Sequence, residues 1–162
     1  MTTIRTHYLD ASAIVKIFLK EEGTEESVRN YFHARHTFYT TWLCVAETLQ
    51  VFKRKFRNRE LTSEQYLNTC NDLMAWLADE GIAVDEKVEI TNREIYSEVE
   101  SLAQIYAIDI ADAFLIVALK RGFFSRMVGE SKPILITADK ELTKIARQKN
   151  VRVWNCMTEP PP

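Results

Sequence analysis

The sequence has few cysteines and no closely spaced pair of them. Its three cysteines, Cys44, Cys70 and Cys156, are an odd number and lie far apart in the chain. Zinc and dithiol redox sites commonly use cysteines two residues apart, and small secreted domains use an even number for disulfides. The sequence therefore argues against a zinc site, a redox centre and a disulfide framework, and we expect a protein of the reducing cytoplasm.

Long apolar runs and an excess of one charge are also lacking. No run approaches the ~18 apolar residues that a membrane span requires. The first residues, "MTTIRTHYLD", lack the apolar segment of a signal peptide, so we expect no membrane association. With 21 Lys and Arg against 23 Asp and Glu, the formal net charge is -2, so no global positive field attracts nucleic acid. A polyanionic partner must be bound by a local patch.

What the sequence does have is the length and apolar content of one globular domain. It holds 162 residues, of which 46% are apolar, enough to bury a core without disulfides. We expect a single domain over residues 1–155. The remaining residues, 156–162, end in "TEPPP", which continues neither a helix nor a sheet, so this tail is predicted to fray.

Short β-like runs alternate with segments of helical periodicity. This alternation predicts an α/β fold with a parallel sheet of about five strands, flanked on both faces by helices. The segment 111–121 is apolar almost all round and is predicted to be an interior helix. The predicted strands are 6–9, 37–40, 82–84, 134–137 and 151–154, and the predicted helices are 12–20, 24–35, 43–58, 63–79, 88–106, 111–121 and 139–149.

Three acids stand where strands end or helices begin. Asp10 follows the first strand, Asp139 follows the strand "ILIT", and Asp112 opens the apolar helix. Each has an ordinary explanation, because aspartate caps helix N-termini or complements the helix dipole in the first turn. Ser12 and Thr137 are alternative caps at two of these junctions, and Asp109 is the expected cap of the apolar helix.

The three positions gain meaning when they are taken together. The carboxyl ends of parallel strands lie at one edge of a sheet, where α/β proteins bind ligands. Carboxylates brought together there repel one another, which favours a bound cation. Oxygen ligands select a hard ion, so the sequence predicts Mg²⁺ or Mn²⁺ rather than zinc. The histidines, His7, His33 and His36, are interpreted as surface or packing residues.

A fourth acid, Glu47, lies in a predicted helix on the side opposite its apolar stripe. That stripe is Val45, Leu49, Phe52 and Phe56. A solvated helical glutamate is the ordinary interpretation. The alternative is that Glu47, one turn into a helix that follows a strand, faces the same edge as the three aspartates. Spacing alone leaves both open.

Taken in order, four segments resemble the PIN domain family, and within it the VapC-type toxin ribonucleases. "YLDASAIVKIFLKEEG" resembles the family's opening strand with Asp-x-Ser, and "AETLQVF" its glutamate segment. "IDIADAFLIVALKRG" is similar to its Asp-Ala-Leu-Ile-Ala-Ala helix, and "ILITADKEL" to its Thr-x-Asp strand end. The likeness runs from about residue 6 to 154. Phe114 departs from the usual run of small residues.

The resemblance implies a PIN-like fold and a metal-dependent endoribonuclease that hydrolyses RNA phosphodiester bonds. It further implies a cytoplasmic toxin that pairs with a small antitoxin and with itself. The apolar helices 12–20 and 24–35 carry candidate partner contacts, although core packing explains most of them. Carried over by position, the catalytic and metal-binding residues are Asp10, Glu47, Asp112 and Asp139, with Ser12, Asp109 and Thr137 in support.

RNA needs a local cationic patch on this slightly acidic chain. The run "FKRKFRNR" follows Glu47 and supplies Lys53, Arg54, Lys55, Arg57 and Arg59 as phosphate contacts. The equal alternative is a solvated helix end complemented by cations. Two other functions stay open: a PIN protein that processes RNA or only binds it, and a phosphoacceptor domain. The latter needs an acidic pair where "THYLDAS" has one acid.

Overall fold

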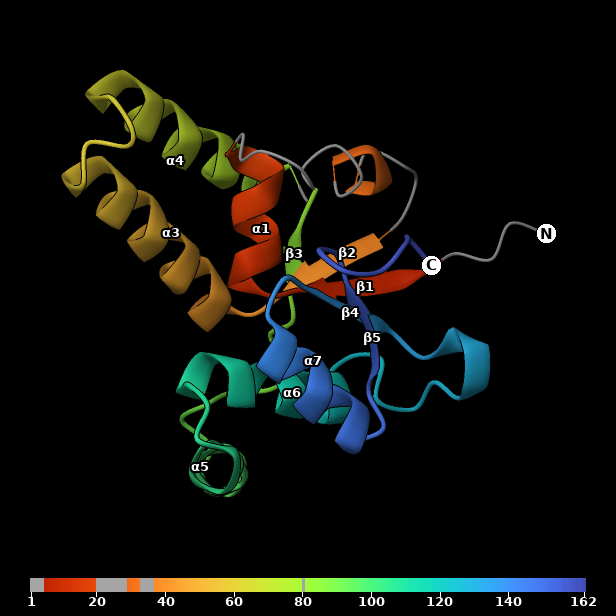
Figure 1. The fold of residues 1–162 in the computed structure, drawn as a ribbon. Helices are drawn as coiled ribbons and strands as arrows, with labels where there is room; N and C mark the ends of the chain where they lie inside the picture. Colours follow the sequence, from red (N-terminus) through yellow and green to blue (C-terminus); the bar gives the residue numbers. More distant parts are fainter. Residues whose placement is uncertain (1–4, 20–28, 33–36, 80) are drawn as a thin grey trace.

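The computed structural model describes residues 5–19, 29–32, 37–79 and 81–162. Within these ranges the elements follow the alternation expected from the sequence (Figure 1). In chain order they are β1 (Thr6–Leu9), α1 (Ala11–Phe18), β2 (Thr37–Thr40), α3 (Trp42–Arg57), α4 (Ser63–Ala78), β3 (Ala83–Val84), α5 (Arg93–Tyr106), α6 (Ile110–Arg121), a short 3₁₀ turn (Gly129–Ser131), β4 (Ile134–Thr137), α7 (Lys140–Gln148) and β5 (Arg152–Asn155).

The strands of the described part form one parallel sheet in the order β3-β2-β1-β4-β5. The predicted strands 6–9, 37–40 and 134–137 have the observed bounds, while β3 and β5 each start one residue later than predicted. β4 is buried along its whole length, as its apolar run predicts, because it lies between β1 and β5 with helices on both sides.

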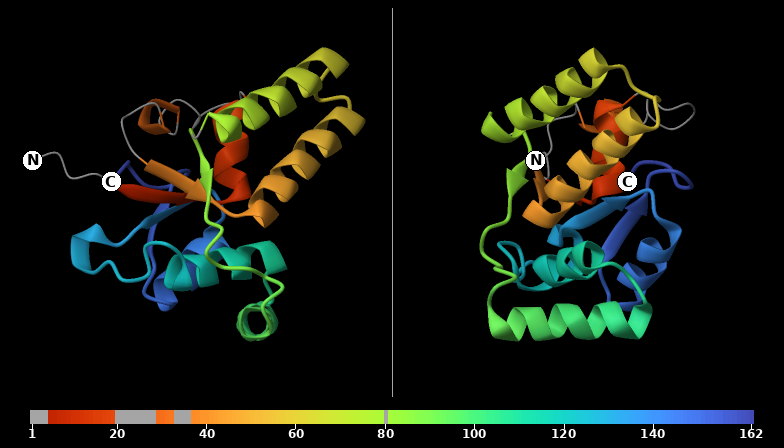
Figure 2. Two further views of the ribbon diagram at one scale, coloured as in Figure 1. Left: turned by 180° about the vertical axis from the view of Figure 1, so that it is seen from behind. Right: turned by 90° about the vertical axis from the view of Figure 1, so that its left-hand side faces the viewer.

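Helices cover both faces of the sheet, which confirms the predicted layers. α1, α3 and α4 lie on one side, and α5, α6 and α7 lie on the other (Figures 1 and 2). α6 packs between the sheet and α5, and its residues 113–119 are all buried. This position explains why its sequence is apolar on every side.

α5 begins later than predicted. Periodicity suggested a helix over 88–106, but the helix starts at Arg93 because Asn92 caps it. The Asn92 side chain accepts hydrogen bonds from the backbone N–H groups of Glu94 (3.0 Å) and Ile95 (3.2 Å). The preceding residues 85–92 form a loop instead, in which Asp85 accepts a hydrogen bond from the Lys87 N–H at 3.0 Å.

Core packing accounts for apolar residues that were also candidates for a partner surface. Ile17 in α1 and Phe32 are 6% and 4% exposed, so both belong to the core rather than to an open groove. Of the predicted helix 24–35, only residues 29–32 lie within the described ranges. Two stripe residues of α3, Val45 and Phe52, are buried as predicted, and Leu49 and Phe56 pack partly against the core.

His7 is a packing residue, as the sequence analysis interpreted it. Its ring is fully buried, and its Nε2 lies 2.6 Å from the hydroxyl of Tyr31. The other histidines, 33 and 36, lie outside the described residues.

Residues after β5 contact the domain before the chain ends. Cys156 is buried, and Glu159 forms an ion pair with Arg147 and accepts a hydrogen bond from the Asn155 N–H at 3.1 Å. The Trp154 Nε1–H also donates to the Glu159 carbonyl at 3.0 Å. In the described part of the chain, no helix combines the length and the apolar character needed to cross a membrane.

Candidate acidic site

The order of the strands places a topological switch point at the carboxyl end of β1. From β1 the chain passes outward to β2 and β3, and it then returns to the other side of β1 as β4. Ligands of α/β proteins bind at such switch points, just beyond the strand ends. Asp10 follows β1 and Asp139 follows β4, so these two acids lie on either side of the switch point. The Asp10 N–H donates to the carbonyl of Ile136 at 3.2 Å, which ties the two strand ends together.

Asp10 caps α1, and Ser12 does not. The Asp10 Oδ1 accepts a hydrogen bond from the Ala13 N–H at 2.8 Å, and the residue is 3% exposed. The alternative that Ser12 is the cap is therefore wrong. Instead the Ser12 hydroxyl donates to the Asp10 carboxylate, at 2.7 Å from Oδ1 and 3.0 Å from Oδ2.

Two hydroxyl groups orient the Asp10 carboxylate. Thr137 Oγ1 donates to Asp10 Oδ2 at 2.6 Å, and Ser12 donates from the other side. Each hydroxyl oxygen itself accepts a backbone N–H at 2.9 Å: Ser12 from Ala138, and Thr137 from Asp139. Because the amides occupy the hydroxyl oxygens as acceptors, the hydroxyl hydrogens are directed at Asp10. A carboxylate has about four acceptor positions, and three donors take three of them, which leaves about one for a ligand.

Asp139 is the cap of α7. Its Oδ1 accepts from the N–H groups of Glu141 (2.7 Å) and Leu142 (2.9 Å), so the ordinary explanation holds for this residue. Oδ2 takes no part in the cap, and the residue is exposed. The Asp139 carboxylate therefore caps α7 with Oδ1 and presents Oδ2 at the edge of the sheet.

The start of α6 differs from the expectation that Asp109 caps it. Asp109 occupies the N-cap position of α6, yet its side chain makes no capping hydrogen bond. Asp112 lies in the first turn of α6 and is partly buried. The Asp109 charge raises the pKa of both Glu47 and Asp112, and the charges of Asp10 and Glu47 also raise the pKa of Asp112. Both residues therefore lie with the other acids.

The ordinary interpretation predicted that Glu47 is solvated, but the side chain does not lie in open solvent. It is partly buried on α3. Burial raises its pKa, and the charges of Asp10, Asp109 and Asp139 raise it further, against the opposing charge of Arg54. α3 thus brings Glu47 to the edge where β1 and β4 end.

The acids act on one another strongly enough to change their protonation. Burial, followed by the charges of Asp10, Glu47, Asp139 and Asp109, raises the pKa of Asp112 to about 7. Burial also raises the pKa of Asp10, although hydrogen bonds from Thr137, Ala13 and Ser12 oppose this. A cluster of carboxylates that repel one another is stabilised by a cation.

Cys44 lies beside the acids, a position that its spacing in the sequence did not signal. Burial raises the pKa of its thiol to about 12, and the charges of Asp10, Glu47 and Asp112 contribute. The thiol is therefore protonated at neutral pH and is a packing group rather than a nucleophile.

The donor set fits a hard divalent cation held partly through water. The oxygens come from Asp10, Glu47, Asp112 and Asp139, and carboxylate oxygen is what Mg²⁺ and Mn²⁺ prefer. As the side chains stand, no three His, Cys, Asp or Glu residues within the described ranges form a direct metal-binding group.

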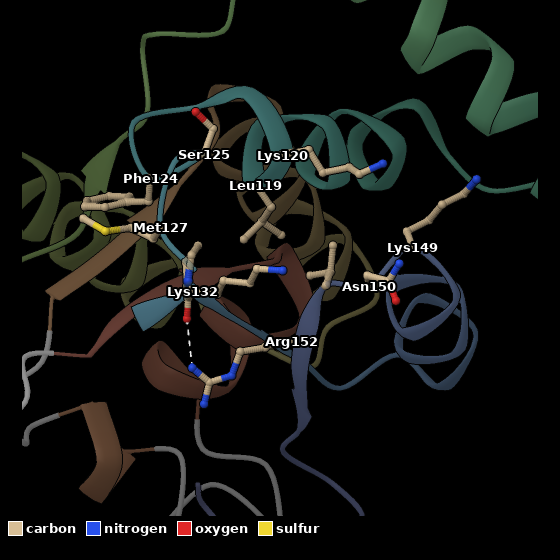
Figure 3. A pocket seen from close by; sticks show the side chains of 11 residues that line it. Leu119, Lys120, Phe124, Ser125, Met127, Lys132, Lys149, Asn150 and Arg152 are labelled. Carbon is tan, nitrogen blue, oxygen red and sulfur yellow. Dashed lines mark hydrogen bonds between the residues drawn. The ribbon is translucent and has the colours of Figure 1, made fainter. Parts of the chain in front are cut away.

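A well-formed pocket lies at the opposite end of the sheet (Figure 3). It encloses about 300 Å³ beside the starts of β4 and β5 and the end of α6. Its cations are Lys120, Lys132, Lys149 and Arg152. Lys120 and Lys149 lie at the carboxyl ends of α6 and α7, where they complement the helix dipoles. Arg152 also donates to the Lys132 carbonyl at 3.0 Å. The pocket is separate from the acidic cluster, which lies at the far strand ends.

Comparison with known proteins agrees with this geometry. The family model described as "PIN domain" matches residues 7–148. The chain belongs to the PIN domain family. PIN domains are generally nucleases, which are hydrolases, and they generally use divalent metals. The family match also sets aside the phosphoacceptor interpretation.

Solved structures share the fold at low sequence identity. PAE2754 from Pyrobaculum aerophilum matches with a TM-score of 0.59 and 16% identity, over 94% of this chain and 90% of that one. FitAcB from Neisseria gonorrhoeae matches with a TM-score of 0.56 and 18% identity, over 94% of this chain and 99% of that one. No curated protein matches the sequence.

Proposed function

We propose that this PIN domain is a divalent-metal-dependent endoribonuclease, and that it is the toxin of a VapBC-type pair. The observation that supports the proposal is the effect of the acids on one another: the charges of Asp10, Glu47 and Asp139 raise the pKa of Asp112. The four acids come from four separate segments, and helix capping explains the positions of only Asp10 and Asp139.

Asp10 and Asp112 are the proposed principal metal ligands, with Glu47 and Asp139 acting through water or on a second ion. When bound, Mg²⁺ or Mn²⁺ lowers the pKa of a water and neutralises charge on the leaving oxygen. Ser12 and Thr137 hold the Asp10 carboxylate in one orientation, and Asp109 adds negative charge beside Glu47. Such supporting hydrogen bonds tune a metal site.

The cationic patch on α3 supplies the proposed phosphate contacts. Gln50, Lys53, Arg54 and Arg57 line a hollow of about 400 Å³ on the helix that carries Glu47. Arg54 acts on Glu47 through space, so the patch begins beside the acids. Lysine and arginine contacts to phosphate position a strand without reading its sequence.

The other cations of this segment have different surroundings. Lys55 forms an ion pair with Glu60 at 3.1 Å, which fixes it at the helix end. Arg59 follows the helix in the left-handed region, at φ 63°. Lys53, Arg54 and Arg57 are therefore the first RNA contacts that we propose, and Lys55 and Arg59 remain further proposed contacts.

Pairing with a small antitoxin, self-association as a homodimer and a cytoplasmic location belong to the same proposal. They rest on the likeness of four sequence segments to VapC-type toxins. Expression of the chain alone is expected to arrest growth, and co-expression of a small DNA-binding protein from an adjacent reading frame is expected to relieve the arrest. Growth that continues normally favours a PIN protein of RNA processing or a non-catalytic scaffold.

RNA cleavage by the purified protein tests the activity itself. We expect cleavage with Mg²⁺ or Mn²⁺, none with EDTA, and a loss of at least about a hundredfold for Asp10→Asn and Asp112→Asn, since each removes a charge from the site. Asp72→Asn, an exposed position on α4, is the matched control and should cleave normally. Full cleavage by both site variants refutes the assignment of these acids.

A further inference from the structure

A second hollow adjoins the acidic cluster. It encloses about 410 Å³ between the first residues of α3, the loop that follows β3 and the first turns of α6. Its apolar walls are Trp42 and Leu43 from α3, Val88 and Ile90 from the loop, and Phe114 from α6. In Figure 2 this loop passes the start of α3 on its way to α5.

The hollow and the acids share two helices. Leu43 lies one turn before Glu47 on α3, about 6 Å along the helix axis. The loop that lines the hollow follows the carboxyl end of β3 in the same parallel sheet. A group bound in the hollow therefore lies at the edge of the sheet that carries the acids, on the side of Glu47.

Trp42 gives the hollow an exposed aromatic surface. It is the first residue of α3 and is 56% exposed. The helix start does not require it, because Thr41 caps α3 by accepting from the Cys44 N–H at 3.2 Å. A single exposed apolar side chain is ordinary. An indole beside an apolar hollow is also a surface on which a flat ring stacks, as aromatic side chains do with unpaired bases.

The charge around the hollow indicates that it binds a base of RNA rather than a phosphate. Glu86 and Glu89 line it, and both are exposed. Carboxylates repel phosphate but accept hydrogen bonds from the amino group of a base. The cations suited to phosphate, Lys53, Arg54 and Arg57, lie instead in the separate hollow farther along α3.

We propose that this hollow binds one unpaired base of the RNA beside the phosphate that is cleaved. Trp42 stacks on the base, Phe114 forms part of the apolar wall, and Glu86 and Glu89 accept its amino group. The inference rests on the proposed ribonuclease function and adds to it a preference for cytosine, adenine or guanine over uracil.

Equilibrium binding of the full chain to short single-stranded RNA in EDTA tests the inference without cleavage. Trp42→Ala should weaken binding by about tenfold to a hundredfold, the range expected for one stacked base. Trp42→Phe keeps a ring and should lose about threefold or less. Tyr96→Ala, an exposed aromatic on α5 that is 46% exposed, is the matched control and should bind normally.

RNA with a single abasic residue identifies the contact. One abasic position should weaken wild-type binding as much as Trp42→Ala does and should not weaken that variant further, because both changes remove the same contact. Uracil at that position should bind less tightly than cytosine, and Glu89→Gln should reduce the difference. If the losses of binding from the abasic residue and from Trp42→Ala add fully, Trp42 does not stack on that base. If uracil and cytosine bind equally well, the base preference is wrong.

The outcomes separate this inference from the proposed function. If the wild type cleaves RNA with Mn²⁺ and Trp42→Ala binds and cleaves equally well, the base site is wrong and the nuclease stands. If Trp42→Ala changes only the oligomeric state on gel filtration, the hollow is a protein interface and the inference fails. If the wild type neither binds nor cleaves RNA, both proposals fail.

Discussion

Replacing Asp112 with asparagine should stabilise the metal-free protein while it abolishes activity. In the native structure, burial and the neighbouring acids raise the pKa of Asp112 from 3.8 to about 7. Below pH 4 the carboxyl is protonated in both the folded and the unfolded chain and has no effect on stability. Between pH 4 and 7 the unfolded chain releases the proton that the folded chain keeps, so stability falls as pH rises.

The size of this effect follows from the difference in pKa. A change from 3.8 to about 7 corresponds to at most about 4 kcal/mol, at ~1.36 kcal/mol for each pH unit. Because Asp112 is only partly buried, solvent screening reduces this, and we expect about 2 kcal/mol. Asparagine has nearly the same shape and no charge. Asp112→Asn should therefore raise the free energy of unfolding by about 2 kcal/mol at pH 8 and by almost nothing at pH 4.

Urea unfolding in EDTA at a series of pH values measures the effect. Asp72→Asn, on the exposed face of α4, is the control for loss of a surface charge and should change stability by less than about 0.5 kcal/mol. Adding Mn²⁺ should stabilise the wild type and not Asp112→Asn, because binding only to the folded state stabilises it. The reasoning is refuted if Asp112→Asn is neutral or destabilising at pH 8, or if its effect does not depend on pH.

Two further substitutions test the supports of the site and of the fold. Thr137→Val removes a 2.6 Å hydrogen bond to the buried Asp10 carboxylate and the acceptor of the Asp139 N–H, so urea unfolding at pH 8 should show a loss of about 2–4 kcal/mol. Thr48→Val, whose buried hydroxyl bonds only a backbone carbonyl, should lose about 1 kcal/mol, and equal losses would contradict a special role for Asp10. Gly122→Ala places a Cβ 2.0 Å from the Asp85 carboxylate and 2.4 Å from the backbone carbonyl of Ala118, so the midpoint of thermal unfolding should fall by several degrees. An unchanged midpoint would contradict this close packing.

Much of the fold was predictable from local pattern. The runs at 6–9, 37–40 and 134–137 became strands with the predicted bounds, since apolar runs between helices form parallel sheets. The start of α5 was not predictable from periodicity, because Asn92 ends the preceding loop by capping the helix. Which strands pair with which was also outside the reach of these patterns, since crossover connections decide it.

The roles of the acids show where local reasoning stops. For Asp10 and Ser12, both caps were possible from sequence, and only the bond from Ala13 to Asp10 decided between them. Asp109 had the position of a cap and did not act as one. For Glu47 the ordinary interpretation, a solvated glutamate, did not predict its partial burial. Segments distant in sequence pack beside this face of α3, and the helical pattern does not contain them.

The sequence by itself determined the type of the elements, the buried character of α6 and the identity of the acids at segment ends, since all of these follow from residues within one or two helical turns. Tertiary structure alone decided that β1 lies between β2 and β4 and that carboxylates from distant segments act on one another's pKa. It also decided that Trp42 stands beside a hollow and that the pocket lined by Lys120, Lys132, Lys149 and Arg152 lies at the opposite end of the sheet. Which segments lie close together depends on crossover connections and on packing, and local sequence patterns specify neither.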